Sequence, residues 1–163
     1  MKLEKASYEI WDEKIPLHDH IEICGRICYA SEATGGEKAI AFCDRLIRSG
    51  HLSVLEHGTV YLKLNNSMSA NVFLISQKYD RNKYSVVNCN DHENDVNNRG
   101  VTYKEYFITT NLRVIVENNW MDDLQYACAC EPTAYHDKRI TVKWNVNRAI
   151  ANEIVRHKIF CVA

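Results

Sequence analysis

The spacing of apolar residues changes in the middle of this chain, and the change limits the folds that it can adopt. Before Gly50 the apolar residues recur at three- and four-residue intervals, the period of a helix with one buried side. From Thr59 to Leu64, and again from Arg139 to Trp144, every second residue is apolar, as in a half-buried strand. We therefore expect an α+β fold, with a mixed sheet and packed helices.

Three helices follow from the helical spacing. The first covers Leu17 to Tyr29. The second should begin near Thr34-Gly-Gly-Glu37, which has the spacing of a capping box, and end at Gly50, a residue typical of helix C-termini. The third covers Asn147 to His157 and has one polar, cationic side. Its apolar line consists of Val146, Ile150 and Ile154.

A chain of 163 residues without internal repeats predicts a single domain. We expect the two alternating strands to lie in one sheet and the last helix to pack against it, because each strand needs one covered face. Ile140, Val142 and Trp144 would then be shielded from solvent.

The region between the two strands is harder to assign. Asn88 to Gly100 is crowded with Asn, Asp and Glu and lacks apolar periodicity, which predicts an exposed loop. Ile108 to Asn118 fits a helix capped by Thr109 or Thr110, and its β-branched residues fit a strand equally well.

Charge and hydropathy exclude several classes of function. The formal net charge is -1 and the signs are interspersed, so we expect no binding to nucleic acid phosphates, although a nucleotide-sized ligand remains possible. The first residues contain no signal-peptide core, and no later stretch approaches a membrane span. The sequence therefore predicts a cytoplasmic protein without a membrane partner.

Seven cysteines without an export signal predict reduced thiols rather than disulfides. Cys24 and Cys28 lie one helical turn apart and should point into the core. Cys128-x-Cys130 lies near His136, but structural zinc sites normally combine two such pairs. We expect no metal, and a zinc-binding structural protein remains the alternative.

Two segments carry side chains suited to chemistry. His51, Glu56 and His57 lie between a helix end and a strand start, and imidazole titrates near neutrality while glutamate can orient it. A helix cap followed by a charged strand entry would look the same. Arg156-His157-Lys158 ends the last helix, where the helix dipole favours cations in any protein.

Together these segments resemble the flavin-dependent thymidylate synthases, also called thymidylate synthase complementing proteins. Gly50-His51-x-Ser53-x-Leu55-Glu56-His57 is similar to the family's Gly-His-x-Ser/Thr-x-x-Glu-His element, and Arg156-His157-Lys158-x-x-Cys161 is similar to Arg-His-Arg-x-x-Ser, which opens its signature. The segments 26–31, 109–114 and 136–142 resemble parts of the longer members. The chain would then be the front part of that fold, with an insertion from Asn65 to about Asp137.

The resemblance implies reductive methylation of dUMP to dTMP, with FAD reduced by NADPH and a carbon supplied by methylenetetrahydrofolate. Family members are homotetramers whose active sites combine several subunits. Carried over by position, Arg156, His157 and Lys158 would lie along the flavin. His51 and Ser53 would contact the flavin or the folate, supported by Glu56 and His57. Guanidinium and imidazole groups suit the negative charge of a reduced flavin and its diphosphate. The resemblance identifies no catalytic residue in this chain.

The chain also departs from the family pattern. Lys158 replaces an arginine whose planar fork lysine cannot copy, and Cys161 stands where the family has a serine. The groups that hold the dUMP phosphate in the family would follow Ala163. We therefore expect an incomplete active site, and a non-catalytic flavin- or nucleotide-binding fragment is the alternative.

The chain as given should not convert dUMP to dTMP, because the nucleotide phosphate would lack its serine and arginine partners. The measurement is tritium release from 5-tritiated dUMP with FAD, NADPH and methylenetetrahydrofolate. A version extended through the rest of the signature is the comparison, and Lys158→Arg should not restore activity. Clear turnover by the unextended chain would contradict the expectation.

Overall fold

The computed structural model describes residues 5–11, 14–27, 31–65, 71–96, 99–126 and 132–154, with backbone alone for 92–96 and 99–103. The helices are α1 (Leu17–Ile27), α2 (Glu37–Ser49), α3 (Val72–Asp80), α4 (Leu112–Glu117) and α5 (Arg148–Ile154), with 3₁₀ helices η1 (Leu52–His57) and η2 (Met121–Tyr126). The strands are β1 (Ser7–Trp11), β2 (Thr59–Asn65), β3 (Val86–Val96), β4 (Arg99–Asn111) and β5 (Thr141–Asn145). The α+β class is confirmed, but all strand pairs in these ranges are antiparallel, where a mixed sheet was expected.

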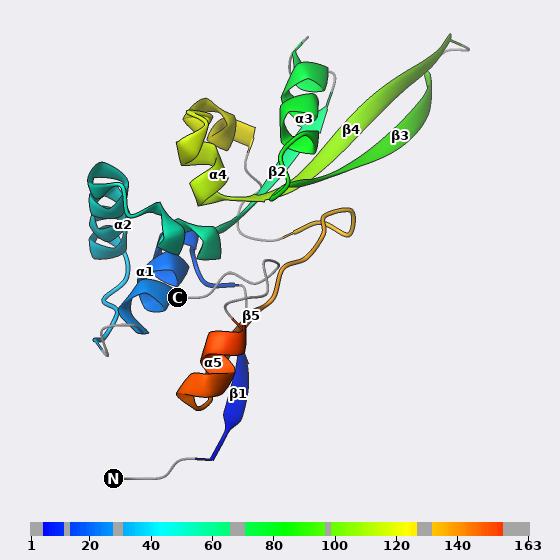
Figure 1. The fold of residues 1–163 in the computed structure, drawn as a ribbon. Coiled ribbons are helices and arrows are strands. Elements are labelled where there is room, and N and C mark those ends of the chain that lie inside the picture. Colours follow the sequence, from blue (N-terminus) through cyan, green and yellow to red (C-terminus); the bar gives the residue numbers. More distant parts are fainter. Residues whose placement is uncertain are drawn as a thin grey trace.

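The main sheet has the order β2-β4-β3, so β4 is its central strand (Figure 1). Leu62 pairs with Ile108 and Leu64 with Tyr106, and these side chains enter one core with residues of α3 and α4. The predicted strand from Thr59 to Leu64 is confirmed. The central strand comes from the part of the chain that was expected to be an insertion.

A short segment between η2 and β5 covers the opposite face of this sheet through His136. The imidazole lies edge-on to the rings of Tyr61 and Phe107, with centroids 5.3 and 5.4 Å away. The backbone N–H of Thr133 donates to His136 Nδ1 over 3.0 Å, so Nε2 carries the proton and donates to the carbonyl of Leu62, also over 3.0 Å. A neutral histidine therefore joins this segment to β2.

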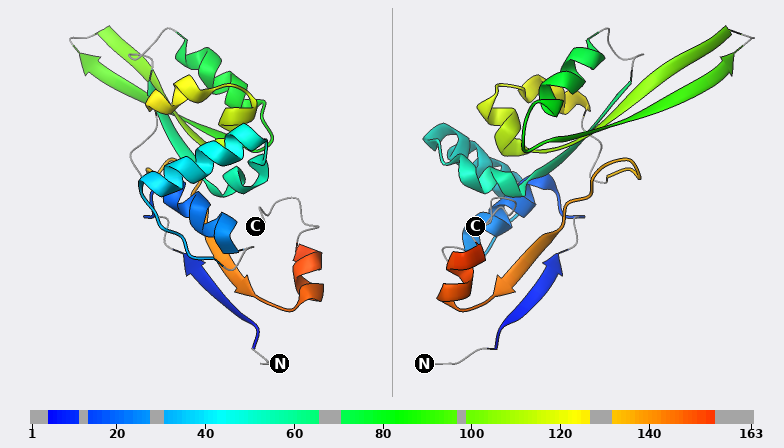
Figure 2. Two further views of the ribbon diagram at one scale, coloured as in Figure 1. Left: turned by 90° about the vertical axis from the view of Figure 1, so that its left-hand side faces the viewer. Right: turned by 45° about the vertical axis from the view of Figure 1, so that its right-hand side comes forward.

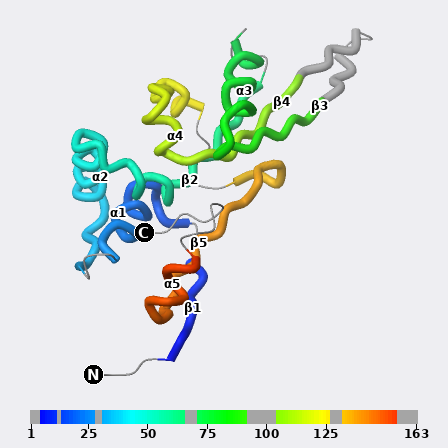
Figure 3. The backbone as a smooth tube through the Cα atoms, in the orientation of Figure 1, coloured from blue at the N-terminus to red at the C-terminus, as the bar shows by residue number. Residues whose placement is uncertain are grey.

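Helices α1 and α2 lie side by side, at the left of the molecule in Figure 3. Ile21 and Cys24 on α1 are buried, as are Ala39 and Cys43 on α2, as the helical spacing of these apolar residues predicts. Ile40, another apolar residue of α2, is instead exposed. The predicted stop at Gly50 is also confirmed, because Gly50 has φ 74° and its N–H bonds to the carbonyl of Ile47.

The predicted capping box at the start of α2 is wrong. The residue before the helix is Gly36, which makes no side-chain cap. Thr34 instead donates its N–H and hydroxyl to the fully buried carboxylate of Glu22, which also accepts the N–H of Gly35 and the side chain of Arg26. A carboxylate on α1 therefore holds the residues before α2, and the N–H of Gly36 donates to Asp19, also on α1, over 2.9 Å.

The two strands expected to share a sheet lie in different sheets. β5 pairs with β1 in a separate two-stranded ribbon, at the opposite end of the molecule from the β3–β4 hairpin (Figure 2). The register places Tyr8 opposite Trp144 and Ile10 opposite Val142, and all four side chains are exposed. Ile140 is exposed too, so the prediction that these residues are covered is wrong. The predicted helix is confirmed for Arg148–Ile154, but none of these residues is buried.

The predicted loop from Asn88 to Gly100 is also wrong. Its described residues belong to the β3–β4 hairpin, whose register runs from Val86 opposite Thr109 to Val96 opposite Arg99. Ile108 to Asn118 is both strand and helix, since β4 ends at Asn111 and α4 begins at Leu112. Asn111, rather than a threonine, caps α4 by accepting the N–H of Val114 over 2.9 Å.

Replacing Glu22 with Ala should lower the free energy of unfolding by about 3 kcal/mol, because Arg26 and two backbone N–H groups lose a buried partner. Urea unfolding at pH 7 measures the change. Glu32→Ala, which removes an exposed carboxylate from the same connection, should change the value by less than about 0.5 kcal/mol. Equal effects of the two substitutions would show that the buried carboxylate does not hold the α1–α2 connection.

Candidate functional site

The segment from His51 to His57 forms a corner between α2 and β2, and its residues divide into outward and inward groups. The 3₁₀ helix η1 has three residues per turn, so Leu52 and Leu55 lie on the same side. Leu55 is fully buried and Leu52 packs against the core. His51 and Ser53 are exposed. The imidazole and hydroxyl can therefore meet a ligand, and the leucines anchor the turn that carries them.

Glu56 is held by an arginine from a distant part of the chain. Nη1 of Arg113 bonds to Oε1 of Glu56, and Nε of the same side chain bonds to Glu117 over 2.6 Å. The backbone N–H of Leu112 also donates to the carbonyl of Gly58 over 2.9 Å. The start of α4 is therefore bonded to the end of η1 by one side-chain contact and one backbone hydrogen bond.

His57 lies inward, close to a second histidine. Burial lowers the pKa of His57, and the neighbouring His20 lowers it further, against the opposing effect of Glu56. His20 is buried, and burial lowers its pKa as well. The Nε2 atom of His20 lies 3.0 Å from the hydroxyl of Thr141, and Trp11 packs edge-on to its ring. Both imidazoles are thus kept neutral, which suits packing more than binding an anion.

The second predicted group of site residues, Arg156, His157 and Lys158, lies outside the described residues, which end at Ile154. Their proximity to His51 therefore stays a prediction. Within the described part of α5, Arg148 and Asn152 are exposed, as expected for its polar side.

Sequence reasoning assigned no role to Arg113 or to His20. Arg113 falls inside one of the segments that resemble the longer family members, but nothing in the sequence indicated Glu56 as its partner. His20 gave no signal, because a histidine on a short helix has no distinctive spacing. The structure brings both to the corner because β2 pairs with β4 and because α1 lies under η1.

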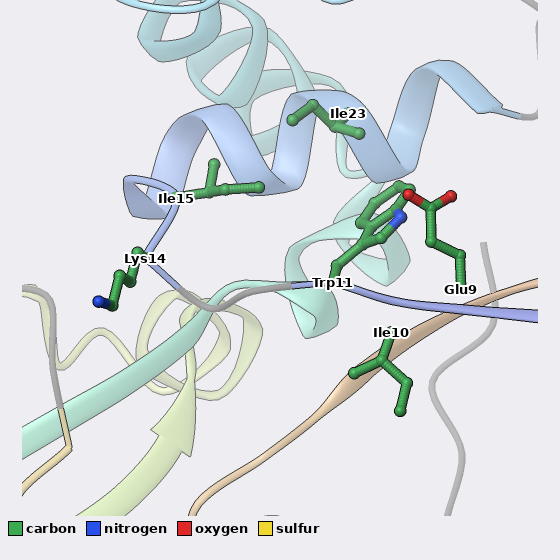
Figure 4. A pocket seen from close by; sticks show the side chains of 6 residues that line it. All are labelled: Glu9, Ile10, Trp11, Lys14, Ile15 and Ile23. Atoms are coloured by element: carbon green, nitrogen blue, oxygen red, sulfur yellow. The ribbon is translucent and has the colours of Figure 1, made fainter.

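A shallow hollow is formed by β1, α1 and the chain between them (Figure 4). Its volume is about 430 Å³. The lining is mainly apolar, with a carboxylate and an ammonium group among the side chains, and consists of Glu9, Ile10, Trp11, Lys14, Ile15 and Ile23. Trp11 links the hollow to His20. No spacing in the sequence pointed to it, since its residues come from β1, from α1 and from the chain between them.

Among the described residues, Cys24, Cys43 and Cys89 carry thiols rather than disulfides. Cys24 points inward as predicted, and Cys28, Cys128 and Cys130 lie outside these ranges. Burial, with Asp44, Glu22 and Asp19 nearby, raises the pKa of Cys43 to about 11, so this thiol is a poor nucleophile. The described ranges contain no cluster of three potential metal ligands and no helix with the length and apolarity of a membrane span.

Comparisons with protein-family models, curated proteins and solved structures gave no match to this chain. The similarity to thymidylate synthases therefore rests on the motifs themselves.

The protein should lose stability as the pH falls below about 6.5. Burial lowers the pKa values of His20, His57 and His136 from 6.5, so the unfolded chain takes up protons first. The contribution of these neutral histidines to the free energy of unfolding is complete above pH 6.5. It is lost as the pH falls through their lower pKa values in the folded protein. Urea unfolding at pH 7.5 and 5.5 tests this.

His136→Gln should reduce the difference between the two pH values and cost about 1–3 kcal/mol at pH 7.5, because it breaks the link between Thr133 and Leu62. An unchanged pH dependence in this variant would remove His136 from the explanation.

Proposed function

We propose that this chain provides the flavin-side part of a flavin-dependent thymidylate synthase, with FAD bound at the surface formed by His51 and Ser53. The observation that carries the proposal is the division of roles at the corner. His51 and Ser53 are exposed, while Glu56 is bonded to Arg113 and His57 is partly buried near His20. This is the arrangement that a binding pair and its two supporting residues require.

The donors at this surface fit an anionic cofactor. The His51 ring and the Ser53 hydroxyl can each donate a hydrogen bond to a flavin or diphosphate oxygen. Arg48, exposed in the last turn of α2, adds a positive charge near His51 in the chain. Bound FAD would supply the hydride chemistry for methylating dUMP, and this chain's own residues would bind and orient the cofactor.

The firm anchoring of the turn that carries His51 and Ser53 also supports the proposed flavin site. Leu55 of η1 is fully buried, and the αL conformation of Gly50 sets the direction in which the chain leaves α2. A surface held in this way loses little conformational freedom on binding, which favours a specific ligand.

FAD binding tests the proposal directly. Titration followed by quenching of flavin fluorescence should give saturable binding by the unmodified chain, and His51→Ala and Ser53→Ala should each weaken it about tenfold, the effect of one lost polar contact. Lys38→Ala is the matched control, because it removes an exposed charge at the other end of α2. Undiminished affinity in both site variants would reject this surface as the flavin site.

The same experiment distinguishes the catalytic role from the non-catalytic alternative. FAD binding that depends on His51, without tritium release from dUMP, would select a flavin-binding fragment. Absence of any flavin binding by the unmodified chain would count against both.

A further inference from the structure

We infer that Arg113 is a positioning residue for the His51–Ser53 surface and acts through Glu56; the flavin-binding part of this inference rests on the proposed function. Arg113 and Glu56 are 57 positions apart in the sequence. Their ion pair joins α4 to η1, the element that carries Ser53 and follows His51.

Helix α4, which carries Arg113, is anchored to the rest of the protein. Leu112 and Ile115 on α4 are buried, and the side chain of Asn111 caps the first turn. Leu112 also bonds to the carbonyl of Gly58. Because α4 is anchored on both sides of Arg113, its guanidinium is a fixed point against which η1 is aligned.

The geometry depends on the planar fork of arginine. One guanidinium reaches two carboxylates at once, Glu56 through Nη1 and Glu117 through Nε. Lysine presents a single ammonium point and cannot hold both partners in the same plane. Without a cation between them, the two carboxylates would also repel each other. Loss of Arg113 should therefore release the Glu56 end of η1 rather than unfold the protein.

Of the two carboxylates bonded to Arg113, Glu56 is the one that belongs to the turn carrying Ser53. It lies three residues after Ser53, one turn along the 3₁₀ helix, so its side chain is attached directly to the turn that presents the hydroxyl. Glu117 lies on α4 itself and stabilises only the helix that carries Arg113. Glu117→Gln is therefore the matched control, since it removes the other carboxylate from the same arginine.

Amide hydrogen exchange tests the positioning without any ligand. Arg113→Gln and Glu56→Gln should each raise exchange over residues 51–58 about tenfold or more, with little change in the β2–β4 core. Glu117→Gln should leave the 51–58 segment close to the unmodified protein, and Arg113→Lys should lie between. Unchanged exchange in Arg113→Gln, or equal changes throughout the chain, would overturn the inference.

FAD titration then connects the position to binding. Arg113→Gln and Glu56→Gln should each weaken FAD binding about tenfold, and the double substitution should be little worse than either single one, because both break the same pair. Fully additive losses would contradict action through Glu56. If the unmodified chain binds no FAD, the proposed function fails, while the exchange measurement still decides whether Arg113 positions the corner.

Discussion

The antiparallel pairing of β2 with β4 is the contact on which the rest of the structure depends. It places Thr59 opposite Asn111, so the turn at Gly58 meets the start of α4 and accepts a hydrogen bond from Leu112. The same register buries Leu62 against Ile108 in the core. Without this pairing, Arg113 could not reach Glu56, and the corner that presents His51 would have no support from the second half of the chain.

Buried polar groups then hold the connections that apolar packing leaves undefined. Glu22 organises the α1–α2 connection, and His136 joins its segment to β2. Asp123 accepts the hydroxyl of Tyr79 over 2.8 Å and pairs with Lys78, which ties η2 to α3. Burial and the bond to Asp123 raise the pKa of Tyr79, so its phenol remains a proton donor. These buried groups join neighbouring segments through directional hydrogen bonds and ion pairs. Losing one partner would leave a buried charge or dipole unpaired.

The sequence predicted the elements whose side chains alternate between core and solvent over short distances. Local periodicity predicts helices α1 and α2 and the strand from Thr59 to Leu64, and the preference of glycine for helix ends predicts the stop at Gly50. The hairpin part from Asn88 to Gly100 was missed because Asn and Asp are poor strand formers and because this segment lacks apolar alternation. The alternation in β5 was recognised, but its partner was wrong, since Val142 and Trp144 remain exposed on a two-stranded ribbon.

For the candidate site, the sequence alone determined which side chains are candidates for binding a ligand and where the chain turns to present them. His51, Glu56 and His57 are candidates because of their residue types, and Ser53 is one through the resemblance to the Gly-His-x-Ser/Thr-x-x-Glu-His element. Only the tertiary structure decided which of them face outward and which residue holds Glu56, because Arg113 comes from a distant segment that the β2–β4 pairing brings to the corner. Local periodicity reports which face of an element is apolar, whereas the choice of partner depends on contacts between distant residues that no short pattern encodes.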